Sequence, residues 1–129
     1  MQEHKTALLV DDDDDFLFQQ KSALEKLGFE VTTASGRQEA VEKLDSLKPD
    51  LAIVDLMMEE MDGGFVLAHQ IRQRYPETRI IMVTAVTGET GLQFGEQPNG
   101  QRRWIKADAV LAKPVRFEQM KREIERVMT

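Results

Sequence analysis

Acidic side chains follow two apolar runs of this 129-residue chain, at the point where each run ends. Asp11 and Asp12 follow the run Ala7–Val10, and Asp55 follows a second run. Carboxylates gathered at one place repel one another and need a cation, and hard oxygen ligands favour Mg²⁺ or a similar ion. With a metal in place, one carboxylate can act as a nucleophile on phosphorus and form an aspartyl phosphate.

A hydroxyl and an ammonium group follow two further apolar runs. Thr84 lies near the end of the run Arg79–Ala85, and Lys113 follows the run Val110–Ala112. A threonine hydroxyl can donate a hydrogen bond to a phosphoryl oxygen, and a lysine can neutralise charge that develops on a transferred group. If the apolar runs are strands of one sheet, these side chains and the three carboxylates share a single site.

The alternation of apolar runs with amphipathic segments is typical of a parallel sheet covered by helices on both faces. The expected strands are Ala7–Val10, Phe29–Ala34, Leu51–Val54, Arg79–Ala85 and Val110–Ala112. The expected helices are Phe16–Leu27, with Gly28 as its C-cap, Arg37–Leu47, Phe65–Tyr75 and Val115–Met128. In an open parallel sheet, ligands bind at the carboxyl ends of the strands, where all the side chains named above are expected.

One long segment does not fit this alternation. Val86–Asp108 contains four glycines and a proline. Because each glycine inside a helix costs roughly 1 kcal/mol, a full regular helix is not expected there. The sequence predicts an irregular or shortened fourth helix, with at most a short helix at Gln101–Ala107.

Composition limits the possible classes of protein. The net charge of −6 argues against direct binding of nucleic acid, which needs a basic surface. The absence of cysteine excludes disulfides, zinc-thiolate sites and thiol catalysis. No apolar run approaches the roughly 18 residues of a membrane span. We expect a single cytoplasmic domain over residues 1–129, without membrane insertion.

Five short motifs occur in the order known from one family and cover nearly the whole chain. They are LLVDD (Leu8–Asp12), PDLAIVDLMM (Pro49–Met58), MDGG (Met61–Gly64), IIMVTA (Ile80–Ala85) and AKP (Ala112–Pro114). With these motifs the chain resembles the receiver domain of two-component response regulators, the CheY-like domains. The resemblance implies a flavodoxin-like fold with strand order 2-1-3-4-5.

The resemblance also implies a function. Asp55 would accept a phosphoryl group from phosphohistidine on a sensor histidine kinase or a histidine phosphotransfer domain. Mg²⁺ would be held by Asp12, Asp55 and the main-chain carbonyl of Met57, with Asp11 close by, through water. Such a domain is a signalling phosphoacceptor that catalyses its own phosphorylation, and we expect a monomer or a weak homodimer. It would be either a stand-alone shuttle or part of a longer regulator.

By the same resemblance, Thr84 would be the switch hydroxyl and Lys113 the lysine of the family, with a cis peptide bond before Pro114. The chain departs from the family pattern at Val110, where the family usually has an aromatic residue. An aromatic rotamer switch therefore cannot operate there. Glu59 stands where the family usually has proline, which predicts a less rigid loop.

Two further residues bear on the lifetime of the phosphoryl group. In the family, the residues two positions after the phosphorylated aspartate and two after the threonine flank the path of the hydrolytic water. Here these residues are Met57 and Val86, which are apolar and cannot orient water. The resemblance therefore predicts slow autodephosphorylation.

The remaining aspartates of the run Asp11–Asp15 are expected to start the first helix. Asp14 is the expected N-cap, and Asp15 favours the positive end of the helix dipole. Leu17 and Phe18 fall outside the expected inward stripe of this helix. They form either a docking patch for a phosphotransfer partner or a surface partly buried against the last helix.

Two alternatives belong to other classes. The start LLVDDD also fits a haloacid-dehalogenase-like phosphatase, with Asp11 as nucleophile and Asp13 as acid. Against it, an acidic pair after the lysine strand is missing, a cap domain has no room, and Asp55 stays unexplained. A pseudo-receiver that only binds partners has little support, because every acidic, threonine and lysine position is filled.

Overall fold

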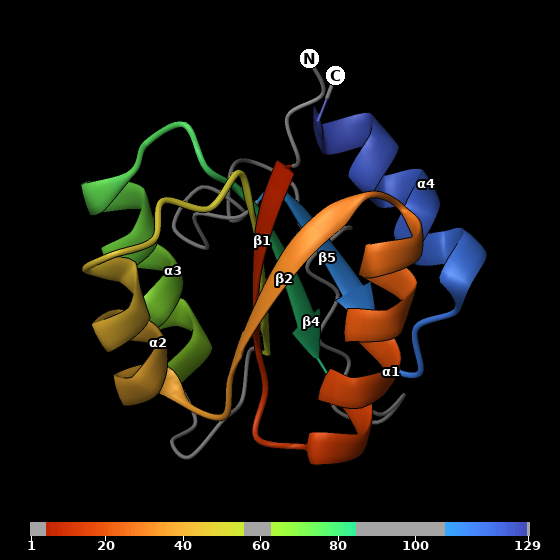
Figure 1. The fold of residues 1–129 in the computed structure, drawn as a ribbon, viewed down its shortest axis with the longest axis horizontal. Coiled ribbons are helices and arrows are strands. Elements are labelled where there is room, and N and C mark those ends of the chain that lie inside the picture. The colour runs from red at the N-terminus through yellow and green to blue at the C-terminus, as the bar shows by residue number, and fades with distance from the viewer. Residues whose placement is uncertain (1–4, 56–62, 85–107, 129) are drawn as a thin grey trace, which may run out of the picture.

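The sheet has the strand order that the resemblance to receiver domains implies. The computed structural model describes residues 5–55, 63–84 and 108–128. Five parallel strands form one sheet in the order β2-β1-β3-β4-β5, the flavodoxin-like order (Figure 1). They are β1 (Lys5–Val10), β2 (Phe29–Ala34), β3 (Leu51–Asp55), β4 (Arg79–Thr84) and β5 (Ala109–Ala112). The segment Val86–Asp108, for which an irregular fourth helix and a short helix at Gln101–Ala107 are predicted, lies outside the described residues except for Asp108.

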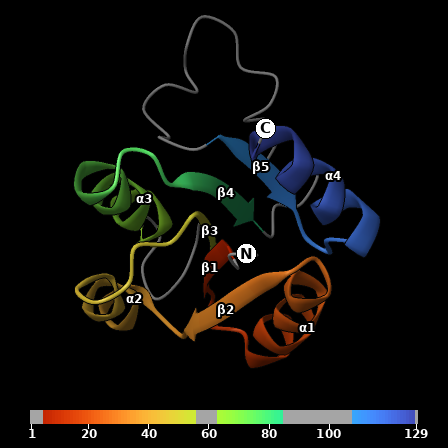
Figure 2. The ribbon, with the colours of Figure 1, turned by 45° about the horizontal axis from the view of Figure 1, so that its top comes forward.

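Two pairs of helices cover the two faces of this sheet. The helices are α1 (Asp14–Lys26), α2 (Arg37–Leu44), α3 (Gly63–Arg74) and α4 (Phe117–Met128). Figures 1 and 2 show α1 and α4 on one face and α2 and α3 on the other. Among the described residues, no helix is long and apolar enough to cross a membrane.

The central strands are apolar on both sides because each face has its own core. Leu9 and Ile53 pack with side chains of α1 and α4, whereas Leu8 and Ala52 pack with side chains of α2 and α3. Successive residues of a strand point to opposite faces, so neighbours in sequence belong to different cores. This explains the uninterrupted apolar runs of β1 and β3.

Polar contacts extend β1 toward its amino end. The sequence predicts that the strand begins at Ala7, whereas in the structure it begins at Lys5. The Thr6 main-chain N–H donates to Asp50 Oδ2 at 2.9 Å, and the Asp50 N–H donates to the Thr6 carbonyl at 2.9 Å. These contacts join two residues that carry no apolar signal, so the strand start could not be read from hydrophobicity.

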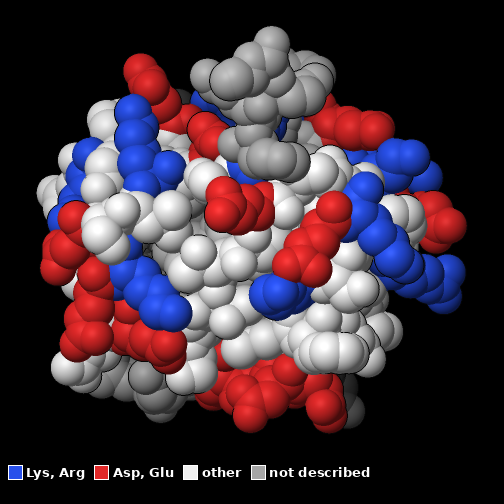
Figure 3. Space-filling view, viewed as in Figure 1, with Lys and Arg blue, Asp and Glu red and all other residues white. Residues whose placement is uncertain are grey.

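The first helix starts one residue away from the predicted position. Asp13, not Asp14, is the N-cap, with φ −99° and ψ 108°. Its Oδ1 accepts hydrogen bonds from the N–H groups of Asp15 and Phe16, at 3.0 and 3.3 Å. Asp14 and Asp15 form the acidic first turn, where carboxylates favour the helix dipole. Acidic side chains gather at the lower edge of the space-filling view, below the start of α1 (Figure 3).

The second helix is shorter than expected. It ends at Leu44 rather than Leu47, because the N–H groups of Asp45 and Ser46 bond to carbonyls three residues back, which tightens the last turn. Tyr75, at the end of α3, donates its hydroxyl to the Leu44 carbonyl at 2.7 Å. The end of α2 is thereby attached to the end of α3.

A cluster of polar contacts closes the amino end of the sheet. Asp108 Oδ2 accepts the Ile80 N–H at 2.8 Å and Arg72 Nη2 at 3.1 Å. Arg79 Nε donates to the Val127 carbonyl at 2.7 Å. These contacts fix the start of β5 beside β4 and hold the end of α4 against the same edge.

Candidate functional site

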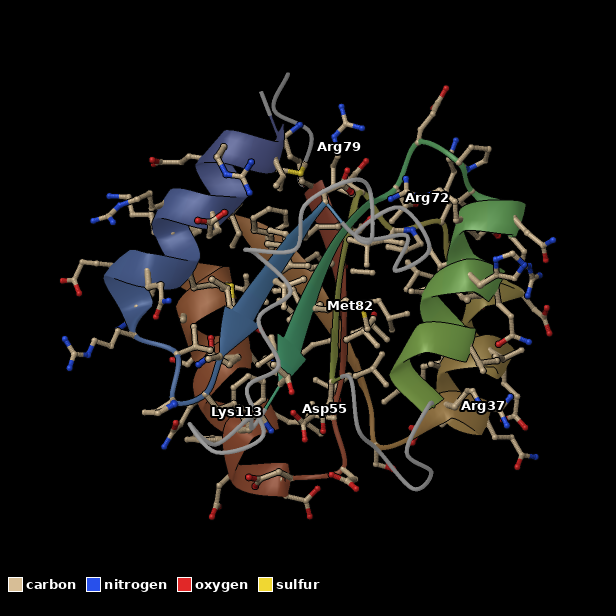
Figure 4. The ribbon with its side chains drawn as sticks, turned by 180° about the vertical axis from the view of Figure 1, so that it is seen from behind. Arg37, Asp55, Arg72, Arg79, Met82 and Lys113 are labelled. Atoms are coloured by element: carbon tan, nitrogen blue, oxygen red, sulfur yellow. The ribbon has the colours of Figure 1, made fainter. Side chains whose placement is uncertain are left out.

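The predicted site residues of the described part of the chain meet at the carboxyl edge of the sheet. Asp11 directly follows β1, Asp55 ends β3, Thr84 ends β4 and Lys113 follows β5. The Lys113 N–H donates to the Thr84 carbonyl at 2.8 Å, which extends the β4–β5 pairing to the lysine. Figure 4 shows Asp55 and Lys113 together at this edge, with Arg72 and Arg79 at the opposite end.

Three carboxylates form the acidic part of the site. Oxygen atoms of Asp11, Asp12 and Asp55 all lie within 4.8 Å of one another. Asp11 is 0% exposed and Asp55 5% exposed, whereas Asp12 is open to solvent. Oxygen donors at this spacing, closed on one side and open on the other, fit a hard cation that keeps some of its water, such as Mg²⁺.

Backbone contacts hold the buried carboxylate in place. The Asp13 N–H donates to Asp11 Oδ1 at 2.8 Å, and the Asp11 N–H donates to the Ala34 carbonyl at 3.1 Å. The N-cap of α1 thus also orients a residue of the acidic cluster. In the described residues, the cluster includes Asp11 and Asp12 but not Asp13–Asp15, so the acidic run divides after Asp12.

Lys113 supplies positive charge to this cluster. Its Nζ lies 2.9 Å from Asp11 Oδ2 and 3.9 Å from Asp55 Oδ2. Burial by itself lowers the pKa of Lys113, but its hydrogen bond to Asp11 and the neighbouring carboxylate charges, Asp55 foremost, outweigh burial and raise the pKa above its ordinary value. The side chain is therefore an ammonium at neutral pH. The peptide bond between Lys113 and Pro114 is cis, as predicted.

Thr84 contributes a buried hydroxyl to the site. Its Oγ1 is inaccessible to solvent and has no hydrogen-bond partner within the parts of the chain that the structure describes. Native proteins rarely leave a buried hydroxyl unsatisfied, because desolvation costs roughly 1–3 kcal/mol. Such an exception at the edge that carries Asp55 is expected where a ligand oxygen completes the contact.

The two residues proposed as a docking patch behave differently. Leu17 packs in the core between α1 and α4, so the prediction that it lies outside the inward stripe is wrong. Phe16 and Leu17 both belong to this core, which also includes side chains of the sheet and of α4, so the buried face of α1 includes both residues. Phe18 is 76% exposed, as expected for a surface residue.

Some sequence-based expectations concern other positions. Val110 is half-buried beside Met82 of β4 and packs against the core under α2 and α3, so no aromatic ring occupies this position. Met57, Glu59 and Val86 lie outside the described residues. The ligand role of the Met57 carbonyl and the lifetime prediction therefore stay predictions.

Sequence reasoning missed one neighbour of the site. The Phe16 ring lies under Lys113, with Nζ 4.5 Å from the ring centroid. The sequence indicates Phe16 only as the start of the expected first helix. Because the contact joins α1 to the loop after β5, no local pattern in the sequence could have indicated it.

Comparison with known proteins identifies the family of this chain. Residues 7–125 match the family described as the response regulator receiver domain. The chemotaxis protein CheY of Listeria monocytogenes is 36% identical over 110 residues, which cover 81% of this chain and 91% of that protein. The transcriptional regulatory protein PhoP of Bacillus subtilis, named for alkaline phosphatase synthesis, is 35% identical over 96 residues and 71% of this chain.

Solved structures are similar over almost the whole chain. CheY4 of Vibrio cholerae has a TM-score of 0.81 at 27% identity and covers 97% of this chain, with 99% of its own chain matched. The response regulator TrrA of Thermotoga maritima, in complex with Mg²⁺ and beryllofluoride, has a TM-score of 0.76 at 28% identity, with 95% and 98% covered. The chain spans less than half the length of some curated relatives, 40% of PhoP and 43% of RegA from Cereibacter sphaeroides.

Fold, site and relatives agree on one class of protein, the phosphoacceptor signalling domains of two-component systems. The chain belongs to the response regulator receiver domain family. Receiver domains bind Mg²⁺ at an acidic site and interact with histidine kinases or phosphotransfer proteins. The alternative of a haloacid-dehalogenase-like phosphatase with Asp11 as nucleophile is not favoured, since the family match and the relatives are those of receivers.

Proposed function

We propose that Asp55 accepts a phosphoryl group, in a Mg²⁺-dependent reaction, from phosphohistidine of a sensor histidine kinase or a histidine phosphotransfer domain. The observation that carries the proposal is the meeting of three carboxylates with the Lys113 ammonium and the Thr84 hydroxyl, which has no partner among the described residues, at one edge of the sheet. This set has the ligands for a cation and two donors for phosphoryl oxygens.

Asp55 is the nucleophile in this proposal for a geometric reason. Asp11 is fully buried, its Oδ1 accepts a hydrogen bond from the Asp13 N–H, and its Oδ2 forms an ion pair with Lys113 at 2.9 Å. Asp55 lies at the end of the central strand and is 3.9 Å from the ammonium, a looser contact. An Asp55 oxygen would attack phosphorus while the phosphorus–nitrogen bond breaks, and the leaving imidazole would keep the bonding electron pair.

The other residues would stabilise charge during this transfer. Asp11, Asp12, Asp55 and the main-chain carbonyl of Met57 would hold Mg²⁺, which supplies positive charge to the phosphoryl oxygens when it is bound. Lys113 would supply the second positive charge, and the Thr84 hydroxyl would donate to a phosphoryl oxygen. Slow hydrolysis of the phosphoryl group belongs to the same proposal, because the apolar side chains at positions 57 and 86 cannot orient water.

We further propose that Phe18 contacts the protein that donates the phosphoryl group. Its ring is largely exposed on α1, the helix whose first turn follows the acidic cluster. A large exposed aromatic residue beside a reaction site is a common feature of protein interfaces. Leu17 does not contribute, because it is buried.

Labelling with a small phosphodonor tests this function. With acetyl phosphate and MgCl₂, the wild type should gain the mass of one phosphoryl group, and Asp55→Asn should gain none. Asp14→Asn is the matched control, since Asp14 is an exposed aspartate outside the cluster and should leave labelling unchanged. Equal labelling of Asp55→Asn, or labelling that persists after removal of divalent cations with EDTA, would contradict the proposal. Steady turnover of p-nitrophenyl phosphate would favour a hydrolase instead.

A further inference from the structure

We propose that Phe16 is a positioning residue for Lys113, whose ring holds the ammonium group at the phosphorylation site while the anionic partners of that group change. The proposal starts from the 4.5 Å distance between Lys113 Nζ and the centroid of the Phe16 ring. It rests on the proposed function, because it assigns a role in the transfer to Asp55.

The ring is fixed independently of the lysine. Phe16 lies in the first turn of α1, and its N–H donates to the N-cap carboxylate of Asp13. Its side chain is 8% exposed and belongs to the core shared by α1 and α4. Because the capping hydrogen bond fixes the main chain at Phe16 and the core packs around the ring, the ring has little freedom to follow the lysine.

The lysine, by contrast, needs a fixed contact. A hollow of about 420 Å³ opens beside it, lined by Phe16, Lys113, Gln20, Pro114 and Val115 among others. The long aliphatic stem of a lysine is flexible, and this space would allow the ammonium to leave the site. The ring opposes such movement from the side of α1.

The contact with the ring does not depend on the state of the carboxylates. The ammonium now binds Asp11 at 2.9 Å and Asp55 at 3.9 Å. Transfer of a phosphoryl group to Asp55 would place new anionic oxygens in front of the lysine and change both contacts. The attraction of the ring for a cation persists through this change, and it is stronger at a partly desolvated site such as this one, where the lysine side chain is 19% exposed.

A matched pair of variants separates this role from simple packing. Phe16→Leu keeps an apolar side chain but removes the ring. Phe29→Leu makes the same change at another phenylalanine of the same core, 7% exposed, that has no contact with Lys113 among those described. Phe16→Tyr keeps an aromatic ring at this position.

The first measurement tests the contact itself by NMR. The ε-methylene protons of Lys113 should be shifted upfield by the ring in the wild type and in Phe16→Tyr, and this shift should vanish in Phe16→Leu. Phe29→Leu should keep it. If Phe16→Leu leaves the Lys113 signals in place, the contact does not exist in solution and the proposal is wrong.

The second measurement tests the effect on the transfer, with the rate of labelling by acetyl phosphate at saturating MgCl₂. Loss of a cation–π contact predicts that Phe16→Leu is slower by roughly 3- to 30-fold, whereas Phe16→Tyr and Phe29→Leu react near the wild-type rate. In a Lys113→Met background, Phe16→Leu should have no further effect, because its partner is gone. If Lys113→Met is labelled too slowly to measure, the same double-mutant cycle can be measured with the dissociation constants for beryllofluoride.

The outcomes distinguish the two proposals. If the wild type shows the NMR shift but is not labelled at Asp55, the proposed function is wrong, and the positioning role fails with it. If the wild type is labelled at Asp55 but Phe16→Leu and Phe29→Leu react equally fast, only the positioning role is overturned. An undiminished effect of Phe16→Leu in the Lys113→Met background also overturns it, since Phe16 would then act by another route.

Discussion

Replacing Asp12 by asparagine should stabilise the protein in the absence of divalent cations. Asp12 lies within 4.8 Å of the carboxylates of Asp11 and Asp55, and the Lys113 ammonium is paired with those two. The substitution keeps the shape of the side chain and removes one of three like charges. Sites built to bind a ligand commonly cost stability when the ligand is absent.

The size of the effect follows from the spacing. Two unit charges 4.8 Å apart repel by roughly 0.9 kcal/mol in bulk water and by roughly 3.5 kcal/mol at an effective dielectric constant of about 20. Asp12 is exposed, so the lower value applies to each of its two neighbours. The attraction of Lys113 for Asp12 offsets part of this repulsion. We expect a net stabilisation of about 1 kcal/mol, or a rise in Tm of roughly 3–5 °C for a chain of this size.

Thermal and urea unfolding in EDTA measure this difference. Asp14→Asn is the control, because it removes a neighbouring exposed carboxylate that favours the α1 dipole, so it should destabilise by roughly 0.3–1 kcal/mol. The gain from Asp12→Asn should shrink at about 1 M NaCl, where the Debye length falls to roughly 3 Å. With MgCl₂ the order should reverse, because the wild type binds the cation more tightly.

Two results would refute this reasoning about Asp12. If Asp12→Asn and Asp14→Asn change stability in the same direction in EDTA, the effect reflects the net charge of the protein and not the cluster. If MgCl₂ stabilises the wild type and Asp12→Asn equally, Asp12 does not belong to the cation site.

Further predictions concern residues away from the cluster. Glu39 accepts hydrogen bonds from Ser35, the one from the backbone N–H foremost, and they lower the pKa of Glu39. The stability that these bonds contribute is therefore present above the usual pKa of about 4.3 and is lost as the pH falls through the lower pKa of the folded state. The difference in unfolding free energy between wild type and Glu39→Gln should narrow in urea titrations at acid pH, and a constant difference would mean that the contact is absent in solution. Asp108→Ala removes the acceptor that the Ile80 N–H and Arg72 Nη2 share, and should cost roughly 2–3 kcal/mol in urea unfolding. A loss below about 0.5 kcal/mol would mean that the cluster is dispensable. Phe18→Ser should change the unfolding free energy by no more than about 0.5 kcal/mol but slow phosphoryl transfer from a protein donor, and an unchanged transfer rate would remove Phe18 from the interface.

The parallel sheet and the meeting of the acidic residues could be predicted from the residue pattern, whereas the strand order came from the resemblance to receiver domains. Apolar runs of β1 and β3 are short and end on aspartates, and parallel strands bring their carboxyl ends to one edge. Asp11, Asp12, Asp55 and Lys113 are therefore together in the structure as expected.

Other features depend on information that the pattern of residue types does not contain. Within a run of identical aspartates, the N-cap is chosen by backbone conformation, which falls at Asp13 and not at Asp14. Leu17 is buried in a core that α1 shares with β-strand residues and with α4, which brings distant segments together. The Phe16–Lys113 contact has the same origin, since one residue comes from the first helix and the other from the last loop.

The double core also has a consequence for how β1 finds its alignment with its neighbours. Leu8 and Leu9 are equally buried and equally apolar, so a slip by one residue would exchange the two faces without exposing an apolar side chain in the middle of the strand. The polar residues at the two ends of β1 oppose such a slip. In one direction it would place Asp11 between apolar residues, and in the other it would break the hydrogen bonds between Thr6 and Asp50. The Asp11 carboxylate, which belongs to the site, thus also helps to fix the register of β1. Replacing Asp11 by an apolar residue would weaken both the ligand set and the register of the sheet.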